Sequence, residues 1–249
     1  MRAMDTFFLL ALLTVFLLAG LVKGLAGFGL PTVAVALMAL TLSPVAAAAL
    51  MIFPSLLTNL WQYARGVERL PLLRRLLGLN LGIVAGTWWG FLPGLAQARD
   101  GTRLLIGAVL LVHGLLGLLR WRPPAPGRHE WWLGPAAGYL GGTLSAASGI
   151  FVVPVIMYLQ SLGLRKEALV TALGLCFSVA TLALGAEVAG AVRARPELML
   201  ASLLALAPAL LGMELGQRLR RRLDELAFQR GFTVAIAVLG AYLLWQALH

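Results

Sequence analysis

The chain has 249 residues, of which 60% are hydrophobic and only 12% are charged, whereas about a quarter of a soluble domain is charged. Long apolar stretches recur from end to end, so the composition excludes a soluble protein and predicts an all-α polytopic protein of the cytoplasmic (inner) membrane. The net charge of +10 does not indicate nucleic-acid binding, because the basic residues lie in short loops between apolar segments. The single Cys176 excludes an intrachain disulfide and a multi-cysteine metal site.

Ten apolar segments follow one another along the chain. The first resembles a signal peptide, but no small-residue cleavage site precedes a polar start, so we interpret it as a retained membrane segment. A helix needs about 20 residues to cross a bilayer, and the pieces 30–42 and 150–162 are too short to do so alone. In order, the segments are 6–23, 30–42, 45–63, 71–93, 103–120, 132–147, 150–162, 168–190, 197–217 and 226–247.

Each short piece follows a stretch of residues that break helices. The first stretch runs from Lys23 to Thr32 and contains three glycines and Pro31; the second runs from Gly141 to Pro154. Glycine permits backbone angles that other residues avoid, and proline lacks a backbone donor. We therefore expect two breaks at membrane depth, where irregular backbone must be buried by protein or line a cavity.

The distribution of basic residues predicts how the chain crosses the membrane. Four loops hold 14 of the 20 basic residues, and the positive-inside rule places them in the cytoplasm. Two of these loops flank the region 132–162, which therefore enters the membrane and returns to the same side. The first half gives the mirror result, with 6–42 as a hairpin and the N-terminus outside. In the alternative, which Arg2 favours, 6–23 is an ordinary span that begins inside.

The two halves also repeat in sequence. Gly27-Phe28-Gly29-Leu30 matches Ala147-Ser148-Gly149-Ile150. The predicted fold is therefore two inverted repeats, each a broken re-entrant helical hairpin plus three transmembrane helices. The repeats are 1–122 and 131–249, joined by a cytoplasmic linker at 123–130. Inverted repeats with broken helices are typical of secondary transporters, whose substrate sites lie near the midplane.

The breaks are candidates for an anion site. The start of each second arm leaves unpaired backbone N–H groups and carries partial positive charge, and two such starts entering from opposite faces would point at one central volume. The alternative is that small residues only let helices pack closely in lipid. The candidate substrate-binding residues are Lys23, Gly24, Gly27, Phe28, Gly29, Thr32, Asn59, Ser145, Ser148 and Gly149.

Several polar side chains in apolar segments have two interpretations. Lys23 either neutralises the anion or extends to the membrane surface. Asn59 and Gln62 share one face of a helix, where they line the path or hydrogen-bond between helices. Glu187 and His113 are candidates for proton coupling, although a structural role is favoured for a lone histidine such as His113.

The chain resembles the TauE/SafE family, whose members are described as sulfite exporters and sulfonate permeases. The resemblance rests on the break in each half, the apolar second arm, the Pro- and Ala-rich helix start at Pro44 and the ending Tyr63-Ala64-Arg65-Gly66. The family's usual Gly-Gly-Gly is replaced by Gly27-Phe28-Gly29 and by Ala147-Ser148-Gly149. The resemblance implies transport of sulfite, sulfoacetate or a related sulfur-containing anion.

The leading hypothesis is a secondary anion transporter that works by alternating access, with no catalytic residue, metal or cofactor. Its expected partners are a small anionic substrate, membrane lipid and protons as coupling ions, and both a monomer and a homodimer stay open. One alternative is an anion channel. Another is an intramembrane enzyme acting on lipid phosphate, which would need a base and its partners in one cavity, whereas most acidic residues lie in loops or near helix ends.

Overall fold

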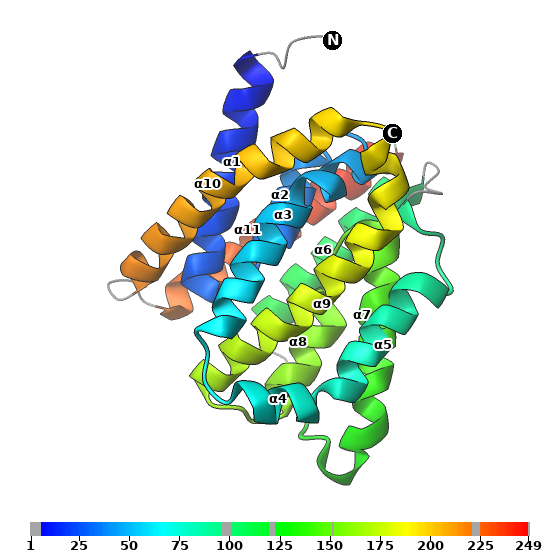
Figure 1. Cartoon of the computed structure of the whole chain (residues 1–249), viewed down its shortest axis with the longest axis vertical. Coiled ribbons are helices and arrows are strands. Elements are labelled where there is room, and N and C mark those ends of the chain that lie inside the picture. The colour runs from blue at the N-terminus through cyan, green and yellow to red at the C-terminus, as the bar shows by residue number, and fades with distance from the viewer. Residues whose placement is uncertain (1–5, 96–100, 120–122, 151, 221–224, 249) are drawn as a thin grey trace.

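The computed structural model describes residues 6–95, 101–119, 123–150, 152–220 and 225–248, and all its regular elements are helical (Figure 1). The first half contains α1 (Thr6–Ala26), α2 (Leu30–Met38), α3 (Pro44–Ala64), α4 (Arg69–Arg75), α5 (Leu77–Trp89) and α6 (Gly101–Leu118). The second half contains a 3-10 turn (Gly127–His129), α7 (Glu130–Ser148), α8 (Val152–Ser161), α9 (Lys166–Arg193), α10 (Pro196–Arg220) and α11 (Glu225–Leu248). The all-helical prediction is confirmed.

Five of the described helices are long and apolar enough to cross a membrane, which confirms a multi-pass membrane protein. They are Phe8–Ala26, Pro44–Ala64, Lys166–Gly190, Pro196–Arg220 and Arg230–Leu248. The predicted single span at 71–93 is wrong. The backbone of Leu76, with φ −94° and ψ 10°, separates α4 from α5, and the 13 residues of α5 cover only about 20 Å.

Two pairs of helices pack in parallel with their backbones in contact. Gly20 and Gly24 of α1 face α10 near Ala209 and Met213, and a β-carbon at either position would overlap a carbonyl oxygen of α10. α5 and α7 pack in the same way, through glycines spaced four residues apart. These are Gly78, Gly82 and Gly86 on α5, with Gly90 just after its end, and Gly138 and Gly142 on α7. Such small-residue spacing lets helices associate in lipid, where the hydrophobic effect does not drive them together.

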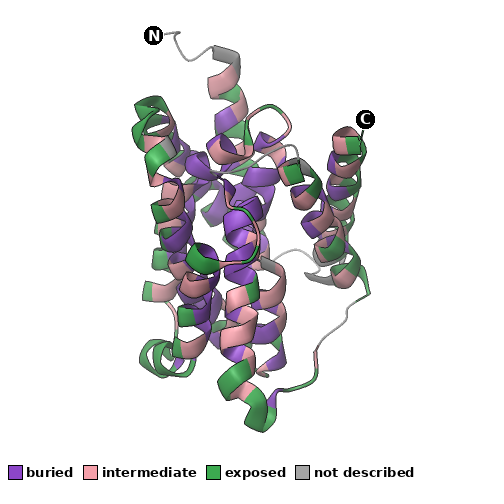
Figure 2. Cartoon of the chain, turned by 90° about the vertical axis from the view of Figure 1, so that its right-hand side faces the viewer, coloured by how far each residue is buried: buried purple, intermediate pink, exposed green. Residues whose placement is uncertain are grey.

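Two further pairs are antiparallel and join the halves of the chain. Along α3 and α9, Ser55 lies beside Thr181 and Gln62 beside Val170. α6 and α11 pack through Gly107 against Leu244 and through Gly117 against Thr233. Buried residues concentrate at the centre of the bundle, and exposed ones lie on the outer faces (Figure 2).

Replacing Gly86 by alanine should destabilise the protein, because the new methyl group must displace the Tyr139 carbonyl of α7. Overpacking of this kind costs about 1–3 kcal/mol. Gly190→Ala is the matched control: Gly190 is also helical, and nothing lies near its β-carbon position, so the change should be neutral or stabilising by up to about 1 kcal/mol. Thermal unfolding in detergent measures both. Equal unfolding temperatures for the two variants would contradict the close α5–α7 contact.

An ion pair ties α4 to the start of α7. The Arg75 guanidinium donates to both carboxylate oxygens of Glu130, at 2.7 and 3.0 Å. The hydrogen bond and charge of Arg75 lower the pKa of Glu130 below its ordinary value of 4.5. A carboxyl with a lowered folded-state pKa stabilises the fold above its unfolded pKa, and the contribution disappears as the pH falls through the folded value.

Glu130→Gln should therefore lower the free energy of unfolding at pH 7 by about 0.5–1 kcal/mol, because the pair is partly exposed. The difference between wild type and variant should shrink as the pH falls below about 4.5. Urea unfolding at pH 7 and pH 4 measures it. A difference that stays constant or grows on acidification would contradict this assignment.

Candidate functional site

The first break lies between α1 and α2, where the predicted irregular backbone is found. Gly27 and Gly29 have φ angles of 84° and 106°, which other residues rarely adopt. Gly29 is the N-cap of α2, and its carbonyl accepts the first hydrogen bond of that helix from Val33 at 2.9 Å. Only glycines allow α1 to end and α2 to begin within three residues.

The Lys23 side chain is buried inside the bundle, one turn before this break. It is 1% exposed and donates a hydrogen bond to the Asn59 side-chain oxygen of α3. This burial rules out the interpretation that it extends to the membrane surface. Among the described residues no carboxylate forms an ion pair with Lys23. A buried ammonium whose partner is a neutral amide is costly, and a charge at membrane depth is a functional-site hypothesis by default.

A chain of side-chain hydrogen bonds continues from Lys23 across the core. Because Asn59 accepts from Lys23, its amide nitrogen is the donor to Ser55, at 3.1 Å. Ser55 lies 3.1 Å from Thr181 of α9, whose hydroxyl donates to the Phe177 carbonyl at 2.7 Å. Thr181 therefore accepts from Ser55. All donors point the same way, from α1 through α3 to α9, and such chains strengthen each member.

Gln62 fixes the first break against the second half of the chain. Its side-chain amide donates to the Gly27 carbonyl at 3.0 Å and to the Val170 carbonyl of α9 at 2.7 Å. The Gly27 carbonyl lies past the end of α1, where the helix offers it no partner. Gln62 therefore satisfies a backbone group that the break exposes.

The second break lies between α7 and α8 at Gly149, which has a φ of 74°. Its N–H donates to the Ser145 carbonyl at 2.8 Å, and the Ser148 hydroxyl accepts from the Ile150 N–H at 3.2 Å while donating to Leu144 at 2.6 Å. Ser148 therefore stabilises the break, and its hydroxyl hydrogen is already used.

The second break lies beside α2 and α3 of the first half. A β-carbon at Gly149 would lie 3.5 Å from Val35 and 3.6 Å from Ala48, so the second break packs beside α2, six residues past Gly29. Those six residues span about 9 Å along the helix. Glycine at position 149 is required by its backbone angle, since a β-carbon there would meet Val35 and Ala48 only at ordinary van der Waals distance. Each break lies beside the other half's second arm, since Phe28 also lines one pocket with Ile156 and Gln160 of α8.

Two predicted site residues carry buried hydroxyls that have no hydrogen-bond partner among the described residues. These are Thr32 in the first turn of α2 and Ser145 in the last turn of α7, both 0% exposed. Buried hydroxyls are normally bonded, as Ser178 is to the Gly174 carbonyl at 2.7 Å. An unpartnered hydroxyl beside each break is what a binding site for a hydrogen-bond acceptor requires.

The remaining candidates divide between packing and the site. Gly24 packs against the α10 backbone, so the structure assigns it to helix packing. The Phe28 ring of the first break lies edge-on to His113 of α6 and Phe232 of α11, with centroids 6.4 and 6.2 Å away. His113 is therefore beside the first break. Glu187 lies at the other break, where a β-carbon on Gly94 would be 2.7 Å from its carboxylate and 3.8 Å from the Ala146 carbonyl.

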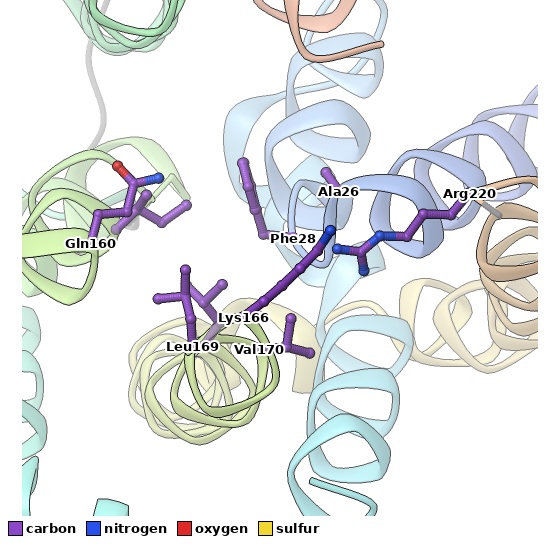
Figure 3. Close-up of a pocket in the computed structure, with 9 residues that line it drawn as sticks. Ala26, Phe28, Gln160, Lys166, Leu169, Val170 and Arg220 are labelled. Atoms are coloured by element: carbon purple, nitrogen blue, oxygen red, sulfur yellow. The ribbon is translucent and has the colours of Figure 1, made fainter. Parts of the chain in front are cut away.

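A pocket of about 90 Å³ lies beside the first break (Figure 3). Its lining joins the break to α8, to the start of α9 and to the end of α10. Lys166 and Arg220 are far apart in the sequence, and the fold brings them together by placing the start of α9 beside the end of α10. The lining residues are Ala26, Phe28, Ile156, Gln160, Lys166, Leu169, Val170, Leu173 and Arg220.

No metal site is evident among the described residues, which contain no group of three or more His, Cys, Asp or Glu side chains able to hold an ion. Cys176 is free and buried.

Asn59→Leu should destabilise the protein by about 1.5–3 kcal/mol, because it leaves the Lys23 ammonium buried without its acceptor. Lys23→Met in the same chain removes the charge and should restore most of that loss, since replacing both partners by apolar groups is often neutral. Denaturant unfolding of the two single variants and the double variant measures the cycle. Additive losses would contradict the buried contact.

The comparisons with known proteins identify a family. The model of the family described as Sulfite exporter TauE/SafE matches residues 12–243. No curated protein and no solved structure matches the chain.

Proposed function

The chain belongs to the Sulfite exporter TauE/SafE family, and from that premise we propose that it is a secondary transporter of sulfite or a small organosulfonate such as sulfoacetate. The family makes it a membrane transporter of sulfur-containing anions, with a small anionic substrate and a lipid environment. The finer proposal is that the anion binds at the two breaks and crosses by alternating access.

The single observation that carries this proposal is the burial of Lys23 beside the first break. Its ammonium is paired with the neutral Asn59 amide and with no carboxylate among the described residues. An anion beside it would offset the cost of burying the charge. The start of α2 at Leu30, with its free N–H groups and partial positive charge, lies seven residues after Lys23 along the chain.

The buried hydroxyls supply the remaining donors. Sulfite and sulfonate groups carry three oxygens that accept hydrogen bonds, and within the described part of the chain the Thr32 and Ser145 hydroxyls have no partner. A hydroxyl donates to an anion as readily as to a carbonyl. One donor in each half of the chain suits an anion that passes from one break to the other.

The helix packing supports an inverted repeat. If α1 corresponds to α7 and α10 to α4 and α5, then the parallel pair α1–α10 corresponds to the parallel pair α5–α7. If α3 corresponds to α9 and α6 to α11, each of these pairs must be antiparallel, as they are. Rocking one repeat against the other would expose the breaks to each side in turn.

Protons are the coupling ions in this proposal, and the candidates for binding them are His113 at the first break and Glu187 at the second.

An anion channel is the alternative that differs in mechanism. Saturable sulfoacetate uptake into proteoliposomes, accelerated by a pH gradient, is expected for the transporter. Flux that rises linearly with concentration and ignores the gradient would contradict it.

Thr32→Val and Ser145→Ala should each weaken sulfoacetate binding about tenfold, because each removes a donor to the anion. Without ligand, both variants should be as stable as wild type or more so, since each removes an unpartnered buried hydroxyl. Thr87→Val and Ser178→Ala are matched controls, because those buried hydroxyls already donate to helix carbonyls at 2.8 and 2.7 Å. Their variants should bind as wild type.

Ligand-dependent thermal stabilisation and calorimetric titration measure these affinities. Unchanged binding in Thr32→Val and Ser145→Ala, or equal losses in the controls, would contradict the site.

A further inference from the structure

A short loop from the first half of the chain is fastened to the start of α9 in the second half. The loop, residues 65–68, joins α3 to α4. Its Val67 N–H donates to the Thr171 hydroxyl of α9 at 3.0 Å. The Arg165 guanidinium, directly before α9, donates to the Glu68 carboxylate at 2.8 Å. These contacts hold the first two turns of α9 against the loop.

The loop is strained at Glu68. This residue has φ 53° and ψ 31°, in the left-handed region, and among the described residues it is the one non-glycine residue with a positive φ. Such a conformation persists only where the surrounding contacts impose it. The ion pair that helps to impose it is exposed, 43% at the Glu68 side chain and 79% at Arg165, and exposed pairs are weak. A strained residue held by weak, exposed contacts is suited to reversible release.

The same turns of α9 cover the first break. A β-carbon on Gly27 would lie 3.3 Å from the Val170 Cγ2 atom, and the Val170 carbonyl accepts the hydrogen bond of Gln62 at 2.7 Å. Lys23, one turn before Gly27, is 1% exposed, so a solute reaches it only if a neighbouring element moves. Val170 and Thr171 are adjacent in α9. Release of the loop from Thr171 therefore frees the segment that packs on the break.

We propose that the loop 65–68 is a cytoplasmic latch, which holds the start of α9 over the first break and must release it before an anion passes between the cytoplasm and Lys23. The proposal rests on the proposed transport function and identifies the contact that controls access to its site. The positive-inside rule assigns both sides of this contact to the cytoplasm, because Arg65 and Arg69 flank the loop and Arg165 precedes α9. The strain at Glu68 favours the released state and the contacts with α9 favour the held one, as in a two-state element.

Loosening the latch should expose the first break. In the full-length chain with Thr32→Cys, a position that is 0% exposed, Glu68→Gln or Arg165→Gln should speed modification of the introduced thiol by a water-soluble methanethiosulfonate. The expected factor is about two to five, which matches the strength of an exposed ion pair. The parent chain, whose single Cys176 is buried, gives the background rate. Glu214→Gln is the matched control, because it breaks an exposed pair of 2.9 Å within α10 and should leave the rate unchanged.

Reversing the pair with Glu68→Arg/Arg165→Glu should restore slow modification, since the Glu68 side chain makes no capping hydrogen bond to α4 that the exchange would remove. Equal rates in Glu68→Gln and Glu214→Gln, or fast modification in the reversed pair, would overturn the latch. This measurement uses no substrate, so it tests the latch independently of transport.

Locking the latch should stop transport. Glu68→Cys/Arg165→Cys, joined by a flexible bismaleimide, should take up sulfoacetate into proteoliposomes at less than about a tenth of the rate of the same variant before cross-linking. Glu214→Cys/Arg218→Cys, joined in the same way within α10, should keep its rate. If the cross-linked Glu68→Cys/Arg165→Cys protein transports at its full rate, the latch fails alone. If wild type takes up no sulfoacetate, the proposed transport function fails, and the modification rates still decide whether the latch exists.

Discussion

The placement of one ammonium group in an apolar bundle shapes this structure. Lys23 is buried beside the first break, and its hydrogen bond to Asn59 begins a chain of donors that reaches α9. Burying this charge is costly unless polar groups are held in place to form hydrogen bonds with it. Gln62 donates to the carbonyls of Gly27 and Val170 and so holds the first break against α9. The positions of Lys23 and of the start of α2 relative to the second half of the chain are therefore fixed.

Close backbone contact allows the breaks to lie inside the membrane protein. The glycine spacing in α1, α5, α7 and α10 brings helix backbones together without the help of a hydrophobic effect. Gly149 has another role at the second break, where its φ of 74° lets the chain turn between α7 and α8 beside Val35 and Ala48. Near each break, Thr32 or Ser145 carries a buried hydroxyl that has no partner in the part of the chain that the structure describes. Small residues therefore serve two purposes at different positions: some let helices pack closely, and others form the breaks.

The sequence predicted what composition and local backbone chemistry determine. Hydropathy gave the membrane class, and Gly27, Gly29 and Gly149 gave the positions of the breaks, because glycine's permitted angles are a local property. The sequence did not predict which side chains contact one another, since these contacts depend on the relative placement of the helices. The sequence did not decide whether Lys23 lies at the membrane surface or inside the bundle. It also did not show that Lys166 and Arg220 line one pocket. Both depend on the fold. The bend at Leu76 was missed, although Arg74 and Arg75 directly precede it and Gly78 follows two residues later, residue types that are common where a helix ends.

The central claim is that Lys23 holds the transported anion, and Lys23→Met tests it most directly. Methionine has similar length and no charge, so the bundle can keep its packing. Calorimetric titration of wild type and Lys23→Met with sulfoacetate, with unfolding temperatures as the folding control, is the decisive measurement. The account predicts a saturable site at the breaks in wild type that is lost in a variant at least as stable. Wild-type affinity in a folded Lys23→Met protein would contradict it.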